Sequence, residues 1–348
     1  MDGGDRILVA AGLTAAVVVG AFVLWGPGGA PKVRKRRGQI AGLQNLGRTC
    51  FLNTLLQALA ACPTFIDWLK KYAKADGHNS MITTLYTVIE VVNGTHESAR
   101  GTPVCPLGVL QSLRAAGWVV PADQQDAHEL LHVLLSCIEE ETTTMSKKVD
   151  PRFPIILRHI HFNSFYKKNT KRPCCFLQSP IRYDKFDSIS LSMANATVGL
   201  TGLPYCLCLH IGRVEWLGGA LNKRGEFVAF PESLSMAPYS VQIDLVSLVA
   251  EGRLRSGLSA LNAAESGAGE AGAALYRLTA VVVHVGGPRS GHFATYRRGN
   301  GFEAKRWWYT SDTLVHEVSL QEVLRCSAYM LFYDYFYGKT TKLNLIGI

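Results

Sequence analysis

The stretch from Ile7 to Trp25 contains no charged residue, and this feature most strongly constrains how the chain can be organised. As a helix, its 19 residues would reach about 28 Å, close to the roughly 30 Å hydrocarbon core of a bilayer. The basic run from Lys32 to Arg37 follows it, and such runs mark the cytosolic side of a membrane. We therefore predict one transmembrane helix at 7–25, with the following chain in the cytosol.

Two alternatives for this stretch are a cleaved signal peptide and a buried core helix. A signal peptide begins with a positive region, whereas here Asp2 and Asp5 accompany a single Arg6. A core helix is seldom free of charge around its whole circumference. A short span rich in Ala, Gly and Val with a dense basic flank favours the mitochondrial outer membrane over the endoplasmic reticulum.

The charge of the chain is concentrated at its N-terminus. Residues 1–38 contribute +4 of the formal net charge of +9, so the remainder is unremarkable and we predict no nucleic-acid partner. The nine cysteines are irregularly spaced, which predicts reduced thiols in the cytosol rather than a disulfide framework. We divide the chain into a tail at 1–6, the span at 7–25, a basic linker at 26–38, one folded domain at 39–337 with a flexible insertion at 251–274, and a tail at 338–348.

Cys50 stands where a glycine-bearing loop runs into a predicted helix. The apolar positions after it recur at helical spacing up to Pro63, and Thr49 is a plausible N-cap. A cysteine in the first turn of a helix is favoured as a thiolate by the helix dipole. Asn45, in the preceding loop, could donate its amide to an oxyanion. The alternative is a buried structural cysteine.

His292 has the surroundings expected of a general base. It follows the apolar run from Leu278 to Val285, which we predict to be a buried strand, and a glycine-rich turn. Glycines beside a histidine let a substrate backbone approach closely. The alternative is a hydrogen-bonded histidine at the end of a strand.

Five segments together resemble the motifs of the ubiquitin-specific proteases, in the order of that family. The segments are Gly-Leu-Gln-Asn-Leu-Gly-Arg-Thr-Cys-Phe-Leu-Asn at 42–53, Gln-Gln-Asp-Ala-His-Glu at 124–129, Cys-Leu-His-Ile-Gly-Arg at 208–213, the box around His284, Gly286, Gly291, His292, Phe293 and Tyr296, and Ala-Tyr-Met-Leu-Phe-Tyr at 328–333. The resemblance is greatest to the family's mitochondrial outer-membrane type, which shares the N-terminal span, the basic run and Ser-Leu-Gln-Glu-Val-Leu at 319–324.

This resemblance implies a papain-like α+β fold with a helical thumb and a β-rich palm, preceded by one transmembrane helix. It implies Cys50 as the nucleophile, His292 as the general base and acid, and Asn45 as an oxyanion donor. In the family, the third member of the catalytic triad is usually Asp or Asn. Ser311 stands at that position here, with Asp312 beside it, and a serine there is a feature of the mitochondrial type. A hydroxyl can fix the imidazole tautomer but adds no charge, so we expect slower turnover than with an aspartate.

The sequence departs from the family between residues 172 and 206. Family members hold zinc in a fingers subdomain with two Cys-x-x-Cys pairs, whereas here Cys174 and Cys175 are adjacent and no second pair follows. We therefore predict reduced or missing fingers, no structural zinc and no other cofactor. Cys206 and Cys208 lie in an apolar strand and are predicted to be core residues. Asp126 to Glu140 is predicted to form an amphipathic helix, and the resemblance implies that Gln125 faces the cleft.

The leading hypothesis is a membrane-anchored cysteine deubiquitinase that hydrolyses the isopeptide bond after the C-terminal glycine of ubiquitin on mitochondrial outer-membrane proteins. The resemblance implies that such an enzyme opposes ubiquitin-driven mitophagy. The alternatives are a catalytically weak ubiquitin-binding anchor, either a pseudo-enzyme or a truncated form, and a protease for a ubiquitin-like modifier.

Overall fold

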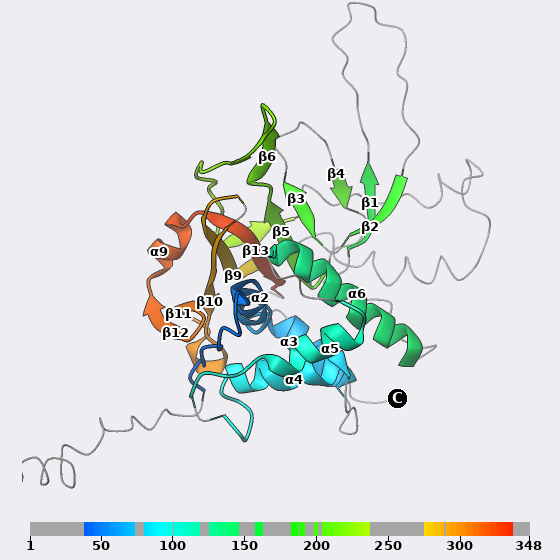
Figure 1. The fold of residues 1–348 in the computed structure, drawn as a ribbon, viewed down its shortest axis with the longest axis vertical. Helices are drawn as coiled ribbons and strands as arrows, with labels where there is room; N and C mark the ends of the chain where they lie inside the picture. Colours follow the sequence, from blue (N-terminus) through cyan, green and yellow to red (C-terminus); the bar gives the residue numbers. More distant parts are fainter. Residues whose placement is uncertain are drawn as a thin grey trace, which may run out of the picture. The chain divides into compact units, whose positions relative to one another are not determined.

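The computed structural model describes residues 38–73, 80–99, 101–118, 125–145, 157–162, 182–186, 188–191, 198–200, 204–236, 275–288 and 290–336 (Figure 1). The chain divides into two units, residues 1–36 and 37–348, and all described residues lie in the second. The predicted span at 7–25, Cys174, Cys175, the insertion at 251–274 and the tail at 338–348 lie outside them. In the described part of the chain no single helix is long and apolar enough to cross a membrane, although the bent pair of helices at 50–72 passes by length and composition.

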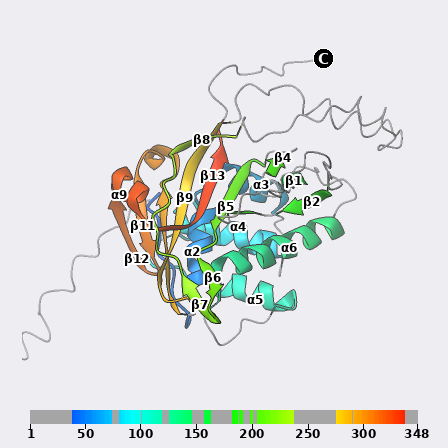
Figure 2. The same ribbon diagram turned by 90° about the horizontal axis from the view of Figure 1, so that it is seen from above.

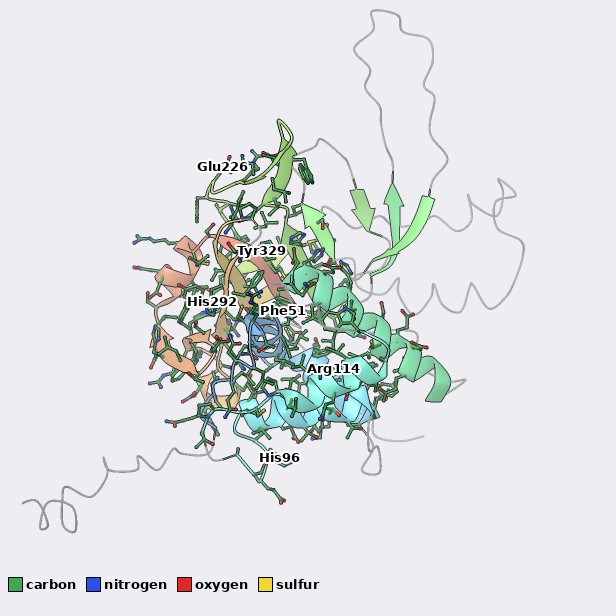
Figure 3. All side chains as sticks on the ribbon, in the orientation of Figure 1. Phe51, His96, Arg114, Glu226, His292 and Tyr329 are labelled. Atoms are coloured by element: carbon green, nitrogen blue, oxygen red, sulfur yellow. The ribbon has the colours of Figure 1, made fainter. Side chains whose placement is uncertain are left out.

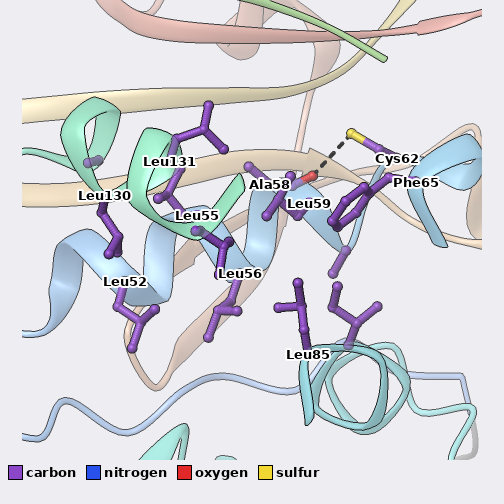
Figure 4. Packing of buried hydrophobic residues seen from close by; sticks show 14 of the residues in the cluster. Leu52, Leu55, Leu56, Ala58, Leu59, Cys62, Phe65, Leu85, Leu130 and Leu131 are labelled. Carbon is purple, nitrogen blue, oxygen red and sulfur yellow. Dashed lines mark hydrogen bonds between the residues drawn. The ribbon is translucent and has the colours of Figure 1, made fainter. Parts of the chain in front are cut away.

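Five helices form one side of the domain. They are α2 (Cys50–Leu59), α3 (Pro63–Tyr72), α4 (Met81–Val92), α5 (Leu107–Ala115) and α6 (Ala127–Met145). The predicted break at Pro63 is confirmed, because proline begins α3. Figure 4 shows how leucines of α2 pack against those of the neighbouring helices α4 and α6: Leu52, Leu55, Leu56, Leu59, Leu85, Leu130 and Leu131.

An eight-stranded sheet forms the other side. Its main path runs in the order β12 (Leu314–Val318), β11 (Trp307–Ser311), β10 (Gly291–Arg298), β9 (Leu275–Gly286), β13 (Ala328–Tyr335), β5 (Cys206–Ile211) and β3 (Ile189–Leu191), and β8 (Ser233–Ser235) pairs with β9. All these pairings are antiparallel except β3 with β5. Cys206 and Cys208 are buried on β5, as predicted.

The remaining described elements lie outside this sheet or connect its strands. They are a three-stranded sheet of β2 (Arg182–Phe186), β1 (Leu157–Phe162) and β4 (Val198–Leu200), a hairpin of β6 (Val214–Leu217) and β7 (Ala220–Lys223), the short helix α9 (Leu320–Arg325) and a 3₁₀ turn at Gly301–Glu303. Ser319 begins α9 as an N-cap, its hydroxyl accepting the Glu322 N–H at 3.2 Å.

The large sheet has a core on each face because its side chains alternate. On β10, Phe293 packs into the cluster shared with the helices, whereas Ala294 packs into a second cluster with Val323 of α9. Figure 2 shows α2 against the sheet on one side and α9 beyond it on the other. One prediction needs correction: the run from Leu278 is buried only to Val283, and Val285 is 64% exposed because β9 continues past the covered part of the sheet.

Arg297 ties β10 to the helices through neutral acceptors. Its guanidinium is completely buried and donates to Gln57 Oε1 at 2.9 Å, and to Ala60 O at 2.9 Å and Asn93 Oδ1 at 2.7 Å. Burial lowers the pKa of Arg297 to about 9. Because buried donors are costly to leave unpaired, these bonds hold α2 against β10 in one position.

Asp334 makes the stability of the fold depend on pH. Its carboxylate at the end of β13 accepts bonds from the hydroxyl and the backbone N–H of Thr64 at the start of α3. Burial raises the pKa of Asp334 to about 7 from its ordinary 3.8. The folded state therefore prefers the protonated form of Asp334. The contribution of Asp334 to the free energy of unfolding is complete below pH ~4 and is lost as pH rises to ~7.

Replacement of Asp334 with asparagine removes this titration. We expect D334N to gain stability relative to the wild type between pH 5 and pH 7, by about 2 kcal/mol, and no further above pH 7.5. Urea unfolding at pH 5, 7 and 8 measures this difference. Parallel pH dependences of the two proteins would contradict it.

Candidate active site

Cys50 is the first residue of α2 and is buried, with 3% of its surface exposed. The predicted N-cap position of Thr49 is confirmed, but its side chain does not cap the helix. The Thr49 hydroxyl instead accepts the Leu46 N–H at 2.9 Å and donates to Asn45 Oδ1 at 3.3 Å, within the loop. The positive end of the helix dipole is thus directed at Cys50 without a side-chain cap from Thr49.

Asn45 organises the loop before Cys50. Its side-chain oxygen accepts the backbone N–H of Gly47 at 3.0 Å and that of Thr49 at 3.1 Å. The loop then passes through left-handed backbone at Gly47 (φ 93°) and Arg48 (φ 57°). Its side-chain nitrogen donates one hydrogen to Asp312 Oδ2 at 2.9 Å, and an amide carries two.

Asp312 joins the loop before Cys50 (residues 42–49, called here the cysteine loop) to the turn between β11 and β12. Its Oδ1 accepts from Asn53 Nδ2 at 2.7 Å, and its backbone carbonyl accepts the Leu43 N–H at 2.8 Å. The residue itself is in left-handed conformation (φ 48°). Gly42 lies so close to Thr313 that a Cβ would stand 2.6 Å from the Thr313 carbonyl oxygen, which explains a glycine there.

His292 and Ser311 meet across neighbouring strands. His292 Nε2 lies 2.7 Å from Ser311 Oγ, the former near the beginning of β10 and the latter at the end of β11. The strand after the glycine-rich turn is confirmed. In Figure 3, His292 and Phe51, the second residue of α2, are labelled close together, and α2 packs against β10.

A lysine of the β6–β7 hairpin binds the turn before His292 by hydrogen bonds. Lys223 Nζ donates to His284 O at 2.9 Å and to Gly286 O at 2.7 Å. His284 stacks on Phe293 with ring centroids 4.5 Å apart. Burial, followed by the charge of Lys223, lowers the pKa of His284, which favours its neutral form. These supports were not predicted, because no local pattern connects Lys223 to a turn sixty residues later.

An open groove lies between the same hairpin and the turn, lined by Trp216, Gly219, Ala220, Leu221, Pro288 and Ser290. Trp216 is 66% exposed. This tryptophan was not among the predicted site residues, although a lone aromatic residue beside the Gly218–Gly219 turn was an available signal.

Asp126 connects the start of α6 to β13. Its Oδ1 accepts the His128 N–H at 2.7 Å, and its Oδ2 accepts from the Tyr329 hydroxyl at 2.6 Å. Burial and this carboxylate raise the pKa of Tyr329 well above its usual range. The predicted helix after Asp126 is confirmed as α6, and it extends to Met145. Gln125 immediately precedes it, and its orientation toward the cleft stays a prediction.

The sequence of this chain is similar to those of known proteins. The family described as ubiquitin carboxyl-terminal hydrolase matches residues 41–333. Ubiquitin carboxyl-terminal hydrolase 30 of Xenopus tropicalis is 31% identical over 453 residues, covering 93% of this chain and 86% of that protein. The protein of the same name from Homo sapiens is 28% identical over 466 residues, covering 94% and 90%.

Solved structures show the same fold. The Ubp8 DUB module of SAGA bound to ubiquitin aldehyde has a TM-score of 0.61 and 21% identity, covering 88% of this chain and 72% of that chain. The module bound to monoubiquitin has a TM-score of 0.62 and 19% identity, covering 95% and 76%.

These matches identify the chain as a cysteine-type deubiquitinase of mixed α/β fold. It belongs to the ubiquitin carboxyl-terminal hydrolase family, as a member of the ubiquitin-specific protease type. The match to the frog relative spans 453 residues, more than the 348 of this chain, so that relative contains segments without a counterpart here.

Proposed function

We propose that this chain cleaves the isopeptide bond after the C-terminal glycine of ubiquitin, with Cys50 as nucleophile and His292 as general base and acid. The observation that carries the proposal is the 2.7 Å contact of His292 Nε2 with Ser311. This contact engages Nε2 of the His292 ring, and Nδ1 then serves to exchange a proton with the Cys50 thiol at the start of α2.

In the first half of the reaction, His292 takes the proton of the Cys50 thiol and the thiolate attacks the carbonyl carbon of the scissile bond. A C–S bond forms, the C–N bond breaks, and the lysine amine leaves with the proton from His292. In the second half, His292 takes a proton from water, whose oxygen attacks the thioester. The C–S bond breaks, the departing thiolate takes the proton back from His292, and the ubiquitin carboxylate is released with Cys50 regenerated as the thiol.

Asn45 would stabilise the oxyanion of each tetrahedral intermediate. One amide hydrogen is held by Asp312, which orients the group, and the second serves as the donor. Asp312 also binds Asn53, so we assign it as a positioning residue rather than a member of the proton relay.

Ser311 is proposed to hold the tautomer and orientation of His292. We expect S311A to lower kcat by about tenfold, because the imidazole loses its partner. We expect S311D to raise kcat above that of the wild type, because a carboxylate stabilises the imidazolium. Steady-state hydrolysis of a fluorogenic ubiquitin amide measures both. An unchanged kcat in both variants would exclude Ser311 from the triad.

Ubiquitin as substrate is supported by the family and by related structures that were solved with ubiquitin aldehyde or monoubiquitin. The alternatives are binding without catalysis and action on a ubiquitin-like modifier. Incubating the full chain with isopeptide-linked diubiquitin and with conjugates of ubiquitin-like modifiers separates the three. Cleavage of diubiquitin alone supports the proposal, whereas cleavage of another conjugate alone, or binding without cleavage, overturns it.

The proposed site of action is the cytosolic face of the mitochondrial outer membrane, on ubiquitinated membrane proteins, in opposition to mitophagy. The uncharged stretch at 7–25 with its basic flank supports this location, as do relatives named ubiquitin carboxyl-terminal hydrolase 30. A fluorescent fusion of the full chain should mark mitochondria and lose that location when residues 1–38 are removed. Unchanged location would contradict the anchor. The absence of zinc and of complete fingers also stays a prediction, since residues 172–181 lie outside the described part.

A further inference from the structure

Three buried threonines form a hydrogen-bonded chain across the three elements that carry Cys50, His292 and Ser311. Thr54 lies on α2, Thr295 on β10 and Thr310 on β11, and their exposed fractions are 3%, 0% and 2%. Each is close in sequence to one member of the proposed triad: one helical turn after Cys50, three residues after His292, and one residue before Ser311. We call these three residues the threonine ladder.

The bonds between α2 and β10 form a two-way clamp. The Thr295 hydroxyl donates to the Thr54 carbonyl oxygen at 2.9 Å, and the two hydroxyl oxygens are 2.5 Å apart. A hydroxyl has one proton to donate. Because the Thr295 proton is already used, the Thr54 hydroxyl must be the donor in the second bond. One residue of the helix and one of the strand thus hold each other by two bonds.

The third bond extends the clamp to β11. The Thr310 hydroxyl donates to the Thr295 carbonyl oxygen at 3.1 Å, and these two residues are also direct partners in the register of β10 with β11. Ser311 therefore follows a residue whose side chain is fixed to the strand of His292. Bonds buried this completely resist exchange with water and strengthen one another.

We propose that Thr295 is a positioning residue for the Cys50–His292–Ser311 triad, acting through the two ends of the ladder. The inference rests on the proposed function, because it assigns to the ladder the alignment that the proton transfer needs. A displacement of about 1 Å at reacting groups can lower a rate by roughly a hundredfold. The Arg297 bonds fix α2 to β10 at Gln57, seven residues after Cys50, whereas the clamp fixes it at Thr54, one helical turn after Cys50.

The test compares Thr295→Val, which removes the hydroxyl at constant shape, with Thr295→Ser, which keeps it. Thr279→Val is the matched control. Thr279 is also buried in the sheet and donates to a backbone carbonyl, that of Phe332 at 3.0 Å, but it lies on β9 away from the triad. We expect T295V to lower kcat at least about tenfold with KM unchanged. T295S should restore kcat, and T279V should leave it unchanged.

A second measurement tests the role of Thr295 independently of the proposed reaction with ubiquitin. Alkylation of Cys50 by iodoacetamide, followed by mass spectrometry of its peptide across pH, reports the thiolate without any ubiquitin substrate. We expect T295V to shift the midpoint of Cys50 alkylation to higher pH, and T295S and T279V to leave it in place. If the wild type cleaves no ubiquitin conjugate, the proposed function fails while this shift still decides the role of Thr295.

Three results would overturn the inference: equal kcat losses in T295V and T279V, failure of T295S to restore kcat, or an unshifted alkylation midpoint in T295V. Should T295V not fold, Thr310→Val removes only the last bond of the ladder. It is then expected to lower kcat several-fold with KM unchanged. An unchanged kcat in T310V would count against the ladder in that case.

Discussion

Replacing Cys50 with alanine is expected to abolish hydrolysis of ubiquitin conjugates, with kcat reduced by about 10⁴-fold or more, because no thioester can form. The free energy of unfolding should change little, since a thiol at the first turn of α2 contributes only a small buried surface. Steady-state hydrolysis of a fluorogenic ubiquitin amide by the full chain gives the kinetic value.

Cys105 offers a matched control for this change. It is exposed and lies beside Val104, which pairs with Leu43 of the cysteine loop. Cys105→Ala should retain wild-type kcat. Full activity in C50A, or equal losses in the two variants, would remove Cys50 from the role of nucleophile.

Replacing His292 with alanine is expected to lower kcat by about 10³-fold or more, since both half-reactions use its imidazole for proton transfer. The residual rate should rise with pH, because hydroxide then forms the thiolate without a base from the protein. A pH–rate profile of the wild type and H292A, measured with the same fluorogenic substrate, tests both statements.

His316 is the control for this second change. It is an exposed histidine on β12, the strand beyond the one that carries Ser311. His316→Ala should keep the wild-type kcat and pH profile. A residual rate in H292A that does not depend on pH would show that His292 does not activate the thiol.

The parts of the site that sequence analysis predicted correctly are those determined by nearby residues. The helix beginning at Cys50 follows from a glycine-bearing loop, a capping position and apolar spacing that ends at Pro63. The strand of His292 follows from alternation after a glycine-rich turn. In both cases the pattern and the element occupy the same short segment.

The parts that were missed depend on contacts between distant segments. Thr54 and Thr295 are 241 residues apart in sequence, and neither stands out locally from an ordinary buried threonine. The pairing of Asn45 with Asp312 likewise requires a loop and a turn 267 residues apart to meet. The buried extent of β9 was overestimated because an apolar run does not show where the neighbouring layer ends.

The central claim is that the Cys50 thiol reacts at the C-terminus of ubiquitin, and one measurement addresses it directly. The full chain is incubated with ubiquitin carrying a C-terminal electrophile, and the site of the adduct is mapped by mass spectrometry. We predict one stable adduct per chain, located on Cys50, absent in C50A and strongly slowed in H292A. An adduct on another cysteine, or tight binding of the probe with no adduct, would contradict the proposed mechanism.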